Sequence, residues 1–190
     1  MQPIEPLLPW DMGAERPRWS ECLLDQTRVL IRPIRKEDAA AELAFIDALS
    51  PRARRNRFLG QVLHPSNATI AQFTDLDYDH DIAFAALLAD QEQAPFIGVC
   101  RYSTSSDGTA CECAVTVLDQ WQNKGLGTAL MKHLIDVARS RGITRMWSMD
   151  AMANVEMKAL AHDLGFERRT DPDDASQVIH SLWLDGDYQS

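Results

Sequence analysis

The sequence predicts a mixed α/β fold of the α+β type, with a mostly antiparallel central sheet of about seven strands and about four flanking helices. Three stretches rich in β-branched and apolar residues follow one another at 82–89, 96–102 and 110–118, and short polar turns separate them. Strands joined by short turns form an antiparallel meander. Helical and strand patterns then alternate to the end of the chain, which predicts one α+β domain.

The elements before the meander begin after an irregular segment. Residues 1–26 contain four prolines and mixed charges, so we expect an irregular N-terminal extension there and a single domain at 27–190. The β-branched stretch 27–34 predicts a first strand. Asp38 is placed as the N-cap of a helix that stops at Pro51, and 52–58 begins a second helical segment.

The elements after the meander start with a long amphipathic helix. Its apolar face is formed by Leu126, Leu130 and Leu134, and Gly142 marks its end. The later elements are a strand at 145–150, a helix at 154–164, and strands at 166–170 and 178–184.

Composition and charge exclude several classes of protein. The 190 residues include 19 basic and 28 acidic side chains, for a net charge of −9, so the chain lacks the basic field that nucleic acids and anionic membranes require. No apolar run approaches the ~20 residues of a membrane span, and the first ten residues have no signal-peptide pattern. The 4 cysteines do not form a disulfide framework. We therefore expect a cytoplasmic protein.

A glycine-containing segment at 122–127 stands between a predicted strand and the long helix. Its six residues are Gln122, Asn123, Lys124, Gly125, Leu126 and Gly127. Backbone N–H groups at such a helix start have no intrahelical acceptor and together bind phosphate groups. The segment lacks the Lys-Ser/Thr of a Walker loop and the third small residue of a dinucleotide fingerprint. On spacing alone, a helix start with tightly packed glycines stays an alternative.

These six residues match the Gln/Arg-x-x-Gly-x-Gly/Ala signature of the GNAT superfamily of acyl-CoA-dependent N-acetyltransferases, which the chain resembles from residue 27 to 184. The resemblance extends to Ile31-Arg32-Pro33-Ile34 in the first strand and to Leu164-Gly165-Phe166 after the last helix. Segments 57–59, 77–79 and 111–117 resemble the GNAT domain of bacterial protein lysine acetyltransferases that modify acyl-CoA synthetases. The resemblance implies a sheet whose fourth strand splays from the fifth.

The resemblance also implies where acetyl-CoA, the expected co-substrate, would bind. The backbones of Val115, Thr116 and Val117 would contact the pantetheine arm in the splay. The segment 122–127 with Thr128 would hold the diphosphate, and Lys124 would add a positive charge beside it. Asn154 would touch the arm from the opposite side, although a plain N-cap is an equal alternative. No metal is expected.

Glu112 is the candidate general base. An amine with a pKa of about 10.4 is mostly protonated at neutral pH and must lose a proton before it attacks a thioester. Glu112 is the carboxylate within the apolar stretch 110–118, where partial burial raises the pKa of a carboxyl group. In the lysine acetyltransferases that the chain resembles, a glutamate at this place is the base. The alternative is a glutamate on a solvated face of the sheet.

The sequence departs from the family at the position of the usual general acid. Many GNAT enzymes have a tyrosine four residues before the glycine of Leu-Gly-Phe, and Ala161 stands there. His162 is adjacent, but a helix turns by ~100° per residue, so we expect it to point elsewhere. The acid stays unassigned.

The sequence thus predicts an acetyl-CoA-dependent N-acetyltransferase in which an amine attacks the thioester directly. The expected acceptor is a protein lysine, with an acyl-CoA synthetase as one class of partner that the resemblance implies. A small-molecule amine as acceptor and a non-catalytic acyl-CoA sensor are the alternatives. We expect a monomer or homodimer.

Overall fold

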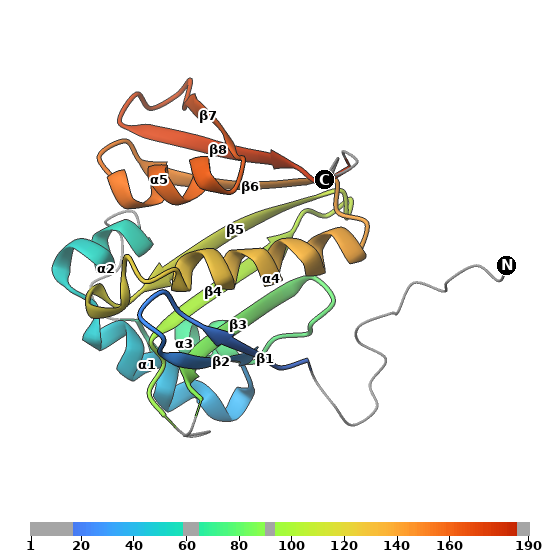
Figure 1. The fold of residues 1–190 in the computed structure, drawn as a ribbon. Helices are drawn as coiled ribbons and strands as arrows, with labels where there is room; N and C mark the ends of the chain where they lie inside the picture. The colour runs from blue at the N-terminus through green and yellow to red at the C-terminus, as the bar shows by residue number, and fades with distance from the viewer. Residues whose placement is uncertain (1–16, 59–64, 90–93, 186–190) are drawn as a thin grey trace, which may run out of the picture.

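The computed structural model describes residues 17–58, 65–89 and 94–185. Within these ranges the chain forms one sheet with helices on both faces, which confirms the predicted fold class (Figure 1). The strands are β1 (Trp19–Cys22), β2 (Arg28–Pro33), β3 (Asp81–Leu88), β4 (Gly98–Thr104), β5 (Ala110–Val117), β6 (Arg145–Ala151), β7 (Glu167–Thr170) and β8 (Gln177–Trp183). The helices are α1 (Ala39–Ala48), α2 (Pro51–Phe58), α3 (Asn67–Thr74), α4 (Leu126–Ser140) and α5 (Val155–Asp163).

The sheet has the strand order β1-β2-β3-β4-β5-β6-β8-β7, and the predicted meander is its antiparallel half, β2 to β5. Strands β5 and β6 are parallel, and they pair over only three positions, with residues 110–112 opposite 145–147. Both strands then continue, β5 to Val117 and β6 to Ala151, without pairing with each other. The expected splay in the sheet is confirmed, and it lies between these two strands.

Helix α4 covers one face of the sheet, and α1 to α3 cover the other. The predicted apolar stripe of α4 is buried, with Leu130 and Leu134 fully inaccessible to solvent. It packs on Cys100 and Met146 in one hydrophobic cluster, while Phe45 of α1 belongs to a second cluster on the opposite face. Burial of such side chains contributes roughly 1.5–3 kcal/mol each. Within the described ranges, no helix has the length and apolar character needed to cross a bilayer.

Two elements were not predicted. Strand β1 lies inside the segment expected to be irregular, and its pairing with β2 corrects that prediction for residues 19–22. Residues 1–16 lie outside the described part. Helix α3 was missed because its apolar residues, chiefly Ile70 and Phe73, make too short a stripe to stand out. Its N-cap is Ser66, whose hydroxyl accepts a hydrogen bond from the Thr69 amide at 3.1 Å.

Asp38 occupies the N-cap position of α1 as predicted, but its side chain forms no capping hydrogen bond with that helix. Its side chain instead accepts two hydrogen bonds from the guanidinium of Arg32, at 2.7 and 2.9 Å, and one from the Arg35 amide. The buried Arg32 needs a carboxylate partner, and this need overrides helix capping. Pro51 follows the end of α1 and is the first residue of α2, a position where its missing N–H removes no hydrogen bond.

Candidate active site

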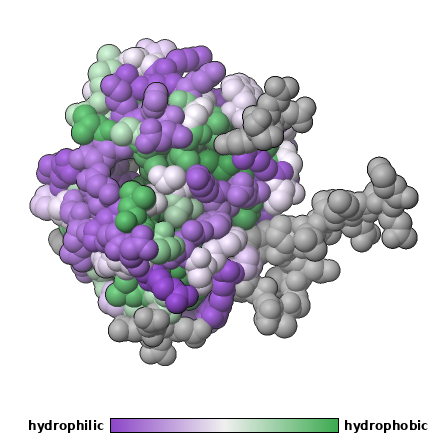
Figure 2. Space-filling model, viewed as in Figure 1, coloured by the Kyte–Doolittle hydropathy of each residue, from purple (hydrophilic) through white to green (hydrophobic). Residues whose placement is uncertain are grey.

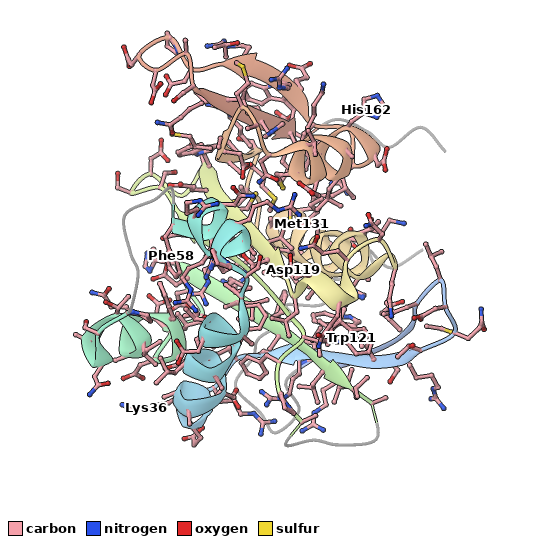
Figure 3. All side chains as sticks on the ribbon, turned by 90° about the vertical axis from the view of Figure 1, so that its left-hand side faces the viewer. Lys36, Phe58, Asp119, Trp121, Met131 and His162 are labelled. Carbon is pink, nitrogen blue, oxygen red and sulfur yellow. The ribbon has the colours of Figure 1, made fainter. Side chains whose placement is uncertain are left out.

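A cavity of about 490 Å³ opens where β5 and β6 diverge. Its walls come from β5, β6, α2, α5 and the turn that begins α4. Figure 2 shows a hollow on this face, below α5, with mostly hydrophilic side chains around its rim. In the view of Figure 3, α2 stands in front of β5, between α1 and α5, so it forms an outer wall of the cavity.

The turn before α4 has a row of unpaired backbone amides. The Gln122 amide donates to the Asp119 carbonyl at 3.2 Å, and the first bond of α4 runs from the Ala129 amide to the Gly125 carbonyl. The amides of residues 123–128 lie between these two bonds, and none of them has an acceptor within the described part of the chain. They stand at the positive end of a 15-residue helix, an arrangement that attracts anions.

The backbone geometry of this turn requires glycine. Gly125 has φ +85°, and Asn123 has φ +58°, so left-handed residues alternate along the turn as in anion-binding nests. A Cβ at Gly127 would lie 3.3 Å from Cδ2 of Leu160 on α5. The second glycine therefore allows Leu160 of α5 to approach the start of α4 closely.

The edge of β5 that faces the gap offers free backbone groups. The Thr109 carbonyl accepts from Thr144 on the β6 side, whereas the Leu118 amide donates to Ile97 on the β4 side. Because backbone direction alternates along a strand, Val115 and Val117 turn their N–H and C=O groups into the gap beyond the paired region.

The same alternation corrects the prediction for Thr116. Its backbone groups face β4, where the register pairs it with Val99, and its carbonyl oxygen lies 3.5 Å from the Cβ position of Gly98. The expected backbone contact with a bound ligand is therefore wrong for Thr116. Its side chain still lines the cavity.

Glu112 lies on the cavity wall at the last β5 position that pairs with β6. Its carboxylate reaches solvent, yet partial burial raises the pKa of Glu112 above its usual value. Among the described residues it has neither an ion-pair partner nor a hydrogen-bond donor that would stabilise the charged form. A carboxylate in this state is a better proton acceptor than an ordinary surface glutamate.

A second carboxylate in the cavity, Asp150 of β6, was missed by the sequence analysis. Burial raises the pKa of Asp150, although hydrogen bonds from Ser148 at 3.0 Å and Asn154 at 3.4 Å oppose the shift. Its place at the end of a strand that borders the splay was the signal that could have identified it. Asn154 also caps α5, since its side-chain oxygen accepts from the Met157 amide at 3.2 Å.

Lys124 and Leu126 point away from the cavity. The Lys124 ammonium pairs with Asp25 at 2.9 Å and lies 4.7 Å from the centre of the Trp121 ring. Leu126 is 1% exposed and packs in the core beneath α4, so only its backbone amide is available at the turn. The side chain of Gln122 holds the end of β5 by donating to the Val117 carbonyl at 3.1 Å.

Comparison with known proteins decides the family. Residues 47–166, more than half of the chain, match the model of the Acetyltransferase (GNAT) family. The chain belongs to the GNAT family. It is therefore an acetyl-CoA-dependent N-acetyltransferase by family, and the predicted family and enzyme class are confirmed.

This GNAT domain is similar to three known proteins in sequence or structure. A Pseudomonas aeruginosa protein named Acetyltransferase PA5475 is 45% identical over 172 residues, covering 90% of this chain and 92% of the relative. The crystal structure of the GNAT domain of S. lividans PAT superposes with a TM-score of 0.80 at 26% identity, covering 90% of this chain and 100% of that domain. The [ribosomal protein bS18]-alanine N-acetyltransferase of Escherichia coli is 38% identical over 56 residues, which are 30% of this chain and 38% of the relative.

Most of the predicted site residues of this GNAT domain meet at one cavity. Those that line it are Glu112, Val115, Thr116, Val117, Gln122, Asn123, Gly125, Gly127, Thr128 and Asn154. Further lining residues that the sequence analysis did not select include Leu24, Arg57 and Asp150. Leu24 and Arg57 come from segments distant in sequence, so no local pattern marks them.

Ala161, which stands where the resemblance implies a tyrosine, lies in α5. Ala161 is 1% exposed and packs in the core. The side chain of His162 is 89% exposed and lies on the outer side of α5, where Figure 3 labels it. The expectation that His162 points elsewhere is confirmed, and it cannot take the place of the tyrosine.

Proposed function

We propose that this enzyme acetylates a primary amine, a protein lysine, with Glu112 as general base. The observation that supports this most directly is the position of Glu112 on the same cavity as the unpaired amides of 123–128. Likeness to the GNAT domain of S. lividans PAT over its whole length supports a protein acceptor. An acyl-CoA synthetase is one class of acceptor that fits this proposal.

The cavity residues fit coenzyme A. The amides of 123–128 would donate to its diphosphate. The free backbone groups of Val115 and the free N–H of Val117 would pair with the amides of the pantetheine arm, as a strand would. When bound, acetyl-CoA supplies a thioester whose carbonyl carbon is open to attack by an amine.

Glu112 would take the proton that the acceptor must lose. A lysine amine is about 3.4 pKa units from neutrality at pH 7, which corresponds to roughly 4.6 kcal/mol. Partial burial raises the pKa of Glu112, which brings it closer to that of the amine and strengthens it as an acceptor. The Val115 or Val117 amide can also donate to a carbonyl oxygen that gains charge during attack.

The cavity also has the charge that a cationic amine requires. Four carboxylates line it, namely Glu112, Asp150, Glu156 and Asp163, against two arginines, Arg52 and Arg57. An excess of negative charge at a concave site raises the local concentration of cations. The CoA thiol has a pKa of about 8.5, so its thiolate can leave without the tyrosine that Ala161 replaces.

The test is the release of CoA thiol from acetyl-CoA with lysine-containing peptides and with a purified acyl-CoA synthetase. We expect Glu112→Gln to lower kcat at least 100-fold, in line with the usual contribution of a general base, and to leave CoA affinity within about twofold. Glu167→Gln on the exposed strand β7 is the matched control and retains full activity. Normal turnover by Glu112→Gln would show that Glu112 is not the base.

Two other acceptors or roles have specific support. The local likeness to bS18-alanine N-acetyltransferases over 56 residues favours an N-terminal α-amine as the alternative acceptor. Ala161, in place of the usual tyrosine, favours a non-catalytic acyl-CoA sensor. A peptide with a free N-terminus and no lysine tests the first alternative. The sensor role requires CoA binding without turnover on any peptide or small amine, such as a polyamine.

A further inference from the structure

The arginines of α2 have different surroundings. Arg52 forms an ion pair with Glu156 of α5 at 2.7 Å, and Arg54 donates to two carbonyls at the end of α1. Arg55 is exposed to solvent. Arg52 and Arg57 both line the cavity, but only Arg57 has Nε and Nη2 buried without a hydrogen-bond partner among the described residues. It therefore differs from a solvated surface arginine.

The Arg57 guanidinium lies against aromatic rings rather than against a carboxylate. Its central carbon is 5.7 Å from the centre of the Phe58 ring and 5.5 Å from that of Phe73. The Nε and Nη2 atoms are inaccessible to solvent, and neither has a hydrogen-bond partner in the described part of the chain. Buried donors without acceptors are destabilising and are rare unless a ligand or water supplies the acceptor.

The local charge balance is positive. The neighbouring Arg101 also lies over the Phe73 ring, at 4.4 Å, and its Nη2 pairs with Oε1 of Glu42 at 2.9 Å. Glu42 is fully buried, so one carboxylate faces two guanidinium groups. Burial and the charge of Arg101 lower the pKa of Arg57 to about 9, which leaves it cationic at neutral pH. Within this cluster one positive charge is therefore not compensated, although the cavity as a whole has more carboxylates than arginines.

Arg57 and the candidate base Glu112 line the same cavity. Arg101, which lies over the same Phe73 ring as Arg57, is opposite Ala114 in the β4–β5 register, two residues along β5 from Glu112. That spacing corresponds to about 7 Å. Residues 112 and 114 share a face of the strand, and α2 lies on that face. An acceptor whose amine is beside Glu112 can thus present a second group to Arg57.

We propose that Arg57 is an acceptor-binding residue that takes a carboxylate carried by the amine substrate. A carboxylate in the cavity neutralises the uncompensated charge of the guanidinium. The carboxylate comes either from an acidic side chain beside the target lysine or from the α-carboxylate of a free amino acid. This inference rests on the proposed amine acetylation and adds the selection of the acceptor to it.

The test uses two matched pairs of acceptors. One pair is a lysine peptide with glutamate or glutamine next to the lysine, and the other is free lysine and its decarboxylated counterpart cadaverine. We expect wild type to favour the carboxylate member of one pair by about tenfold or more in kcat/KM, and that pair identifies the source. In Arg57→Met the ratio falls towards one, and Arg57→Lys restores part of it. Arg55→Met is the matched control and keeps the wild-type ratio.

A binding measurement separates failure of this inference from failure of the proposed function. Glutarate, which has carboxylates and no amine, should raise the melting temperature of wild type and not that of Arg57→Met. Because Arg57→Met removes a buried charge without a partner, its own melting temperature should not fall below that of wild type. If wild type acetylates none of the four acceptors, the result contradicts the proposed function and not the assignment of Arg57. A wild type without preference in either pair, or one that glutarate does not stabilise, overturns the assignment of Arg57.

Discussion

Arg52 of α2 and Glu156 of α5 form a 2.7 Å ion pair that joins the two helices on either side of the cavity. Both side chains are partly exposed, at 56% and 37%, so solvent screens the pair. Such pairs contribute at most about 1 kcal/mol to stability. The interaction therefore matters more for access to the cavity than for the fold.

Removal of this ion pair should change acceptor selection. We expect Glu156→Gln to alter the free energy of unfolding by less than about 1 kcal/mol in urea titrations. Because the link between α2 and α5 is lost, kcat/KM for a lysine peptide should rise relative to that for a small amine. The same shift should occur in wild type at high salt, which screens the pair. An unchanged ratio in both experiments would contradict a role in access.

Glu112 should give both activity and stability a pH dependence. The base acts in its deprotonated form, so kcat/KM should fall as the pH drops through the raised pKa of Glu112. A carboxyl group whose pKa is higher in the folded state is destabilising once the pH rises through that pKa. Glu112→Gln should therefore be more stable than wild type at pH 7 and equal to it at a pH below the ordinary pKa of a glutamate. Equal stability of the two proteins at every pH would show that the carboxyl group is not desolvated.

Gly125 should be essential for CoA binding for two separable reasons. Its φ of +85° disfavours any side chain by about 1–2 kcal/mol, and a carboxylate there would repel a diphosphate. We expect Gly125→Glu to abolish CoA binding in calorimetric titrations. Gly142, with φ +76° and no atom within 4 Å of its Cβ position, gives the matched control. Gly142→Glu should lose similar stability and keep CoA affinity; equal loss of affinity in both variants would point to unfolding.

The Asp25–Lys124 pair should weaken the attraction of the turn for phosphate. The Lys124 ammonium lowers the pKa of Asp25 to about 2, so Asp25 is charged at every working pH. Asp25→Asn removes this charge and leaves Lys124 free to approach a bound anion. Its affinity for CoA should increase by about two- to tenfold at low salt, with a smaller gain at high salt. A decrease would indicate that the pair holds the turn in its binding geometry.

The elements that could be predicted from the sequence are those with a strong apolar periodicity and those that end at a glycine. Helix α4 and the strands β3 to β5 were predicted within a few residues, because burial alone selects their apolar patterns. Strand β1 was missed since its pairing with β2 is a tertiary contact that four residues cannot signal. The N-cap position of Asp38 was predicted, but the pairing of its side chain with Arg32 was not, because Arg32 becomes buried only in the folded sheet.

The site was predictable where one segment supplies it and not where distant segments meet. The turn 122–127 carries its own glycine pattern, so its unpaired amides were predicted. Arg57 lies in an arginine-rich run that has the composition of a solvated helix, and only the packing of α2 against the cavity shows that it is buried. Asp150 likewise becomes part of the site through the divergence of β6 from β5.

The interaction between the amides of 123–128 and the CoA diphosphate is measured most directly by NMR. Amide chemical shifts of ¹⁵N-labelled protein are recorded in two separate titrations, one with CoA and one with pantetheine, which lacks the diphosphate. The amides of 123–128 should shift with CoA and not with pantetheine, whereas those of Val115 and Val117 should shift with both. If the amides of 123–128 respond equally to the two compounds, or to neither, they do not hold the diphosphate.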